Sequence, residues 1–151
     1  MVGRNSMTVI AARAVLVLLC LVESAAARDD IVLIVSARSP IVQLDSTQMR
    51  RLFLGMTVVL GGNRMRPLLN TSSPKLREIF LQNIVAMSES TYDRYVLRMS
   101  LQQGRVPPTV VKSSDQLMSM VASDLLAVSF ASQSDVAHDS RIRVLRMVWH
   151  D

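Results

Sequence analysis

Two short stretches of the sequence lack the alternation of apolar and polar residues that is typical of a strand with one wet face. Residues 31–35 are all Ile, Val or Leu, and residues 125–130 contain one serine among apolar residues. A strand without a polar face is covered by protein on both sides. The two stretches therefore predict strands in the middle of a buried sheet.

Between these strands, capping residues predict the starts of several amphipathic helices. A Ser or Asp at the N-cap accepts a hydrogen bond from the first turn, and a glutamine three residues later completes a capping box. Two of the predicted starts have that glutamine, and a third has proline at the first helical position, where its missing N–H costs nothing. The predicted N-caps are Asp45, Ser73, Ser113 and, for the remaining helix, Ser88 or Ser90.

The remaining strands complete the predicted architecture. Residues 56–60 and 64–69 flank Gly61-Gly62-Asn63, which predicts a hairpin. Residues 109–111 and 142–148 are further strand candidates. Buried strands that alternate with helices favour an α/β fold, a sandwich with a mixed central sheet and flanking helices. No repeat or linker divides it, so we expect one domain over residues 28–151.

The first 27 residues have the form of a secretory signal peptide. Arginines precede the apolar run of residues 14–22, and residues 25–27 are alanines that suit cleavage after Ala27. We therefore expect residues 1–27 to be removed, a periplasmic protein, and no stable membrane span after cleavage. The alternative is an uncleaved membrane anchor, although the run is shorter than the roughly 20 residues that span a bilayer.

The charge and the composition of the chain limit the kinds of ligand and activity that it can have. Positive residues outnumber negative ones by 17 to 12, which fits an anionic partner. His138 and His150 have no ligand partner at metal spacing, and no nucleophile motif or paired carboxylates are visible, so we expect no metal, no cofactor and no enzyme activity. Aromatic residues make up only 4% of the chain, which disfavours nucleic acid. The arginines of residues 142–148 fit a soluble sheet edge better than a nucleic-acid or membrane contact.

The strongest candidate site is the predicted helix start at Thr71, Ser72 and Ser73. Its hydroxyls and free backbone N–H groups suit a small oxyanion such as phosphate. The alternative interpretation is that these hydroxyls only cap the helix. Arg38 and Ser39 follow the first buried strand, at the edge where α/β sheets bind ligands. If the two loops converge, they would form an anion cradle.

The order of these motifs resembles the phosphate ABC-transporter substrate-binding proteins, and more closely their short, single-lobe relatives. The resemblance covers residues 31–148. It is carried by the Ser-Pro helix start, by Gly-Arg-Val-Pro-Pro at residues 104–108, by the strand at 126–130 and above all by residues 44–55, Leu-Asp-Ser-Thr-Gln-Met-Arg-Arg-Leu-Phe-Leu-Gly. It implies a periplasmic-binding-protein-like fold of type 2 and non-catalytic recognition of an oxyanion.

The resemblance also implies a role for the candidate turn. In the family, a Ser-Gly-Thr turn before a helix supplies hydroxyls to phosphate, and Thr71, Ser72 and Ser73 occupy the corresponding place. The charged lead-in to that turn, the Gly-Thr pair and a second lobe have no counterpart here. We expect a solute-binding-like protein for transport or sensing, with a small oxyanion and a transporter as partners. The alternative is an exported envelope interaction or adaptor module that has lost ligand binding.

Overall fold

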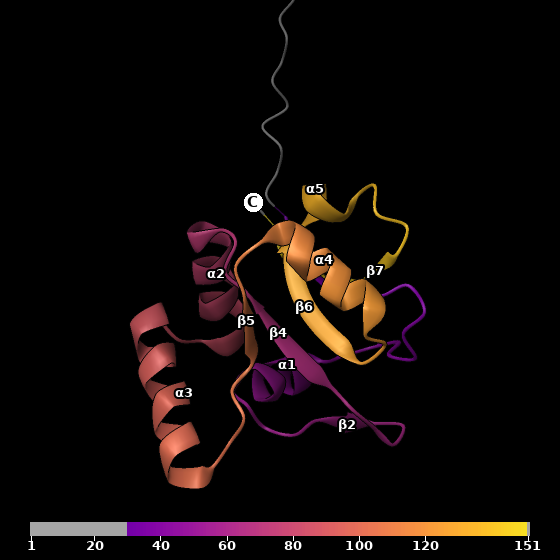
Figure 1. Ribbon diagram of the computed structural model, residues 1–151. Coiled ribbons are helices and arrows are strands. Elements are labelled where there is room, and N and C mark those ends of the chain that lie inside the picture. Colours follow the sequence, from indigo (N-terminus) through magenta and orange to yellow (C-terminus); the bar gives the residue numbers. More distant parts are fainter. Residues whose placement is uncertain (1–29, 151) are drawn as a thin grey trace, which may run out of the picture.

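The computed structural model describes residues 30–150 (Figure 1). The expected signal peptide lies outside these residues. The strands are β1 (Ile31–Ser36), β2 (Val59–Leu60), β3 (Asn63–Arg64), β4 (Arg66–Asn70), β5 (Thr109–Val111), β6 (Ala127–Ser132) and β7 (Ile142–Trp149). The helices are α1 (Ser46–Phe53), α2 (Pro74–Phe80), the π-helical segment η1 (Leu81–Val85), α3 (Glu89–Gln103), α4 (Ser114–Ser123) and α5 (Gln133–Val136).

The main sheet has five strands in the order β5-β4-β6-β1-β7, and β2 with β3 forms a separate small hairpin. Strand β4 runs parallel to both β5 and β6, whereas β1 runs antiparallel to β6 and β7. The sheet is therefore mixed, as predicted. β1 therefore starts at the end of the sheet where β4 and β6 finish.

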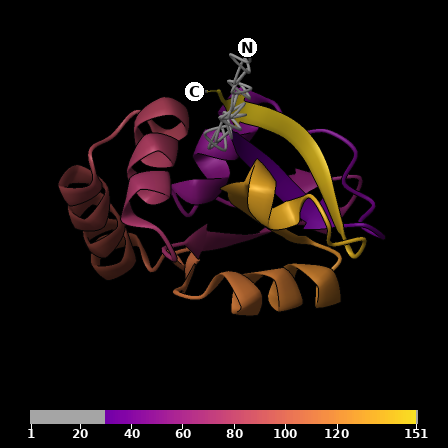
Figure 2. The same cartoon turned by 90° about the horizontal axis from the view of Figure 1, so that it is seen from above.

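Helices cover both faces of the sheet, which explains why residues 31–35 of β1 are all apolar. Ile31, Leu33 and Val35 point into a core formed with α1, α2 and η1. Val32 and Ile34 point into a second core formed mainly with α4. Figure 2 shows α4 on one side of the sheet and the magenta and indigo helices on the other. All six residues of β1 are buried, so the prediction from its sequence is confirmed.

Three phenylalanines form the centre of the larger core. The rings of Phe80 and Phe130 stack with 3.7 Å between centroids, and Phe53 meets Phe80 edge-on at 4.8 Å. Tyr92 ties α3 to this core, since its buried hydroxyl donates to the Phe53 carbonyl at 2.7 Å. Burial raises the pKa of Tyr92, so the phenol stays neutral and keeps its proton for this bond.

The predicted helix caps form where the sequence placed them. Asp45 and Gln48 make a reciprocal capping box at α1. Ser73 and Ser88 accept from the first turns of α2 and α3. Ser113 accepts from the backbone of Gln116, but the return bond from the glutamine side chain is not part of this cap.

Two segments differ from the sequence-based expectation. The predicted hairpin forms over Val59–Arg64, but the following residues Arg66–Asn70 leave it and enter the main sheet as β4. The predicted helix from Pro74 changes to π-helical geometry at Leu81 and stops at Ala86, which adopts a left-handed φ of 58°. The apolar spacing was the same in both halves, so periodicity could not reveal this change. Among residues 30–150, no helix has the length and apolarity that a membrane span requires.

Candidate functional site

The Thr71–Ser73 turn connects β4 to α2 and borders a small cleft. The cleft has a volume of about 240 Å³. Ser72, Ser73 and Lys75 line it from the β4–α2 side. Ser132, Ser134 and Asp135 line it from the β6–α5 turn, which consists of the end of β6 and the start of α5. The two turns meet because β4 and β6 are parallel neighbours that end at the same side of the sheet.

A buried asparagine shapes the turn. Asn70 has no solvent-exposed surface, and its Nδ2 donates to the Phe130 carbonyl at 2.9 Å. Its Oδ1 accepts from both the backbone N–H and the hydroxyl of Ser72, at 3.0 and 2.7 Å. The Ser72 proton is therefore used inside the protein, and this hydroxyl offers a ligand only its oxygen.

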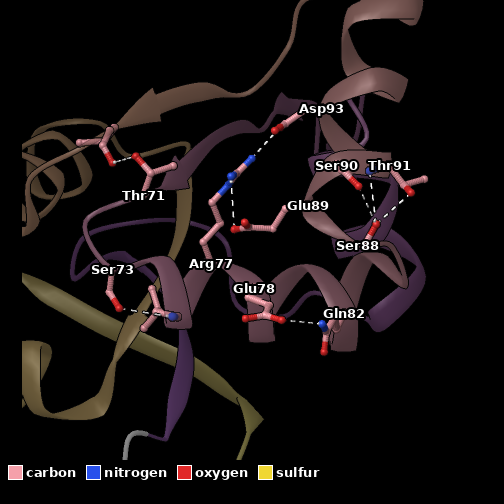
Figure 3. Close-up of polar contacts among 12 residues, drawn as sticks. Thr71, Ser73, Arg77, Glu78, Gln82, Ser88, Glu89, Ser90, Thr91 and Asp93 are labelled. Carbon is pink, nitrogen blue, oxygen red and sulfur yellow. Dashed lines mark hydrogen bonds and ion pairs between the residues drawn. The ribbon is translucent and has the colours of Figure 1, made fainter.

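The three predicted hydroxyls consequently differ in what they can donate. Thr71 Oγ1 donates to the Val111 carbonyl at 3.1 Å, and its side chain lines a different groove, between α3 and β5. Ser73 Oγ accepts from the Leu76 N–H at 3.4 Å, as Figure 3 shows. No acceptor among the described residues takes the Ser73 proton, so Ser73 keeps a donor for a ligand in the cleft.

The opposite wall offers a second donor. Ser132 Oγ accepts from the Asp135 N–H at 3.2 Å and lies 3.1 Å from Ser134 Oγ. One proton serves the bond between the two serines, so the proton of the other hydroxyl points elsewhere. Lys75 brings a positive charge to the cleft, and Asp135 brings a negative one. The cleft thus combines hydroxyl donors with balanced charge.

Arg38 and Ser39 lie at the other end of the sheet, so the two predicted loops do not converge. The reason is strand direction: β1 is antiparallel to β6, and its carboxyl end lies beside the start of β6. Ser39 is 8% exposed, donates to the Leu125 carbonyl at 2.6 Å and accepts from the Ile41 N–H. Arg38 is exposed to solvent. The expected two-loop anion cradle is absent from residues 30–150.

The sequence did not reveal an ion-pair cluster that lies beside the turn. Arg77 of α2 binds Glu89 at 3.3 Å and Asp93 at 2.6 Å, both from α3 (Figure 3). Two carboxylates outweigh one guanidinium, so this cluster repels anions and holds α3 against α2. Glu89 and Asp93 are four residues apart and so share one face of α3, but nothing in the sequence identified the arginine that they bind.

The sequence analysis also missed polar residues of the turn and cleft, among them Asn70, Lys75, Ser132 and Ser134. Asn70 and Lys75 flank the predicted hydroxyls, so their proximity was a usable signal. Ser132 and Ser134 follow a buried strand, which is the same pattern that singled out Arg38 and Ser39. Their place beside Ser73 depends on β4 and β6 being neighbours, which the sequence does not show. The binding roles of Thr71, Ser72, Ser73, Ser39 and Arg38 stay predictions.

The fold is that of periplasmic-binding-protein-like α/β proteins. A Clostridium perfringens protein assigned as a phosphate ABC-transporter substrate-binding protein, solved with bound phosphate, matches with a TM-score of 0.57 and 20% sequence identity. A possible phosphate-binding protein from Planctomyces limnophilus matches with a TM-score of 0.57 and 10% identity. The resemblance seen in the sequence is thus confirmed at the level of the fold.

Both matches are partial for the larger proteins. They cover 80% of this chain but only 45% and 42% of the other chains, as a single lobe would. No protein-family model and no curated protein matches the sequence. These likenesses therefore describe the architecture, and the ligands of the matched proteins remain their own.

Proposed function

We propose that this chain is an exported, non-catalytic, solute-binding-like protein that recognises phosphate or another small oxyanion for transport or sensing. The observation that carries the proposal is the cleft between the β4–α2 and β6–α5 turns. Its Ser73 and Ser134 hydroxyls and the Lys75 ammonium group suit the oxygens of an anion. The fold shared with half of a phosphate-containing binding protein supports the same role.

The charge balance of the cleft sets the expected strength of binding. Asp135 opposes an anion that Lys75 attracts, and the cleft is open to water on one side, where screening weakens each contact. Binding from a single lobe is therefore expected to be weak, in the millimolar to high micromolar range, by the usual affinity arithmetic.

Calorimetric titration of the purified protein with sodium phosphate tests the proposal. Sodium sulfate serves as the second oxyanion, and sodium chloride at the same ionic strength corrects for general salt effects. Lys75→Ala should weaken phosphate binding by about tenfold through loss of a charge-assisted hydrogen bond. Ser134→Ala should weaken it by about threefold, because one of the two paired hydroxyls that line the cleft is removed.

The matched control is Lys112→Ala, which removes the other lysine of the chain. Lys112 lies on the groove beside α3 and not on the cleft. This variant should bind phosphate within about twofold of the parent, since only general electrostatics change. No heat and no thermal shift at millimolar phosphate, or equal losses in the two lysine variants, would reject the cleft as an oxyanion site.

Export is a separate part of the proposal and has its own test. The arginines, the apolar run and the terminal alanines of residues 1–27 support it. Expression of the full chain in a Gram-negative host, followed by N-terminal sequencing, should give a mature protein that begins at Arg28 in the periplasmic fraction. A retained N-terminus in the membrane fraction would favour the anchor instead.

A further inference from the structure

The two edges of the sheet differ in how well they are protected from pairing with another strand. Strand β5 has three residues, follows Pro107-Pro108 and precedes Lys112, and short length, proline and lysine all discourage strand addition. Strand β7 has eight residues and no proline. Its outer side is the long open edge of this sheet among residues 30–150.

The hydrogen-bonding pattern shows which backbone groups of β7 face outward. The Ala37 N–H donates to the Arg141 carbonyl at 2.8 Å, so the backbone groups of Arg141 point toward β1. In an antiparallel pair, the backbone N–H and C=O groups of successive residues point alternately toward and away from the partner strand. The backbone groups of Arg143 therefore point toward β1, and those of Val144 point away from it. Val144 pairs with Ile34 in the register, and its side chain is 39% exposed. Its N–H and carbonyl are therefore available to an added strand.

Arginines make this edge strongly basic. Arg146 is exposed and has no ion pair among the described residues. Arg143 donates to the carbonyls of Ser39 and Ile41 at 2.9 and 2.8 Å, which are neutral partners that leave its charge uncompensated. Arg141 is paired with Asp139, and exposed Arg38 follows the Ala37 that bonds β7. The edge carries more positive than negative charge along most of its length.

We propose that β7 accepts an acidic, extended segment of a partner protein as an added strand. Backbone bonds at outward positions such as Val144 would supply affinity, and carboxylates on the segment would meet Arg146 and Arg143. A second copy of this chain is a poor occupant, because pairing two β7 strands brings two basic edges together, and like charges repel. Two register shifts bend β7 against β1, which a flexible segment follows more readily than a rigid sheet edge.

This proposal does not depend on the oxyanion cleft, which lies at the turns after β4 and β6. It also goes beyond the solubilising role that the sequence suggested for the arginines. A solubilising edge needs charge but no partner, and its loss produces self-association. A docking edge binds a complementary strand and depends on the outward backbone as well as on charge.

The test is titration with a synthetic ten-residue peptide that alternates glutamate with valine and threonine. Trp149 is the single tryptophan of the chain and ends β7, so its fluorescence reports binding directly. Val144→Pro removes one outward N–H and should weaken binding at least about tenfold, while proline is tolerated on a sheet edge. Val144→Ala keeps the N–H and should bind within about threefold of the parent.

Charge is tested independently of the proline. Arg146→Glu should weaken binding of the acidic peptide about tenfold, and the same peptide with lysine in place of glutamate should not bind. Amide hydrogen exchange on the parent protein should slow at Val144 when the acidic peptide is added, a readout that stands even if Val144→Pro does not fold.

Three outcomes would overturn the proposal. The first is full binding by a folded Val144→Pro variant, which would reduce the contact to general electrostatics. The second is unchanged exchange at Val144 in the complex. The third is a concentration-dependent dimer of the parent that Val144→Pro dissociates in sedimentation experiments, which would assign the edge to a second copy.

Discussion

The two ends of the sheet carry different polar chemistry, and both use most of it internally. At the end where β4 and β6 finish, Asn70 and the serines bond mainly to nearby backbone and to one another. At the other end, Ser39 bonds to Leu125 and Ile41, and Arg66 pairs with Asp124. Arg38 and Arg66 therefore lie at the opposite end of the sheet from the hydroxyls of the cleft. The polar groups left for a ligand are the few hydroxyl donors of the cleft, at the end where β4 and β6 finish.

Of the substitutions that test this difference between the two ends, Asn70→Ala should lower the free energy of unfolding most. It leaves the buried Phe130 carbonyl without its donor, empties the space of a buried side chain and removes the bonds to Ser72, so the free energy of unfolding should fall by about 3 kcal/mol. Urea denaturation measures the change. Asn83→Ala, at an exposed position on η1, should stay within about 0.5 kcal/mol of the parent. Equal effects of the two substitutions would show that Asn70 does not organise the turn.

Ser39→Ala tests the other end of the sheet. It removes a bond to the Leu125 carbonyl and a bond from the Ile41 N–H, and should cost about 2 kcal/mol of unfolding free energy. Phosphate affinity should not change, because Ser39 lies far from the cleft. A loss of phosphate binding without a loss of stability would instead support the cradle formed by the two loops. Ser119→Ala, on the exposed side of α4, is the matched control.

Ser73→Ala separates capping from binding at the first end. Loss of the N-cap of α2 should lower the unfolding free energy by about 1 kcal/mol whether or not an anion binds. The proposed function further requires weaker phosphate binding by the folded variant, measured calorimetrically. A stability loss with unchanged affinity would leave Ser73 a cap and nothing more.

The Arg66–Asp124 pair should give the smallest effect, and one that depends on pH. The hydrogen bond from Arg66 holds the pKa of Asp124 below its usual value. A lowered pKa in the folded state stabilises the protein above the ordinary aspartate pKa, and this contribution disappears as the pH falls through the lower folded value. Arg66 is 59% exposed, so Arg66→Gln should cost less than about 1 kcal/mol at pH 7. Thermal unfolding across this pH range should show the difference from the parent shrinking in acid.

Local signals in the sequence predicted local structure well. The apolar residues 31–35 indicated a strand buried on both faces. Asp45 and Ser73 indicated helix starts that the structure contains, and of the alternatives Ser88 and Ser90 the structure has Ser88 as the N-cap. These features depend on residues within one turn or one strand. The fold class followed from them.

Features that depend on strand direction and neighbours could not be predicted. Nothing in residues 31–35 reveals that β1 runs against β6, which is why the sequence left open whether the loops of Ser39 and Ser73 converge. Ser134 and Ser73 are 61 positions apart in the numbering, and they meet only because β4 and β6 are adjacent. A candidate site made of turns from several strands therefore becomes visible only in three dimensions.

The position of β1 between β6 and β7 has a consequence for the order in which the protein folds. The earliest described strand fills the middle of the sheet, and both of its neighbours come from the last quarter of the chain. Such non-local pairing is slow, and it cannot be completed while the ribosome still holds residues 127–149. The central strand of such a nascent chain stays unpaired until synthesis is nearly finished, and an incompletely folded polypeptide is one that can still pass through a narrow translocation pore.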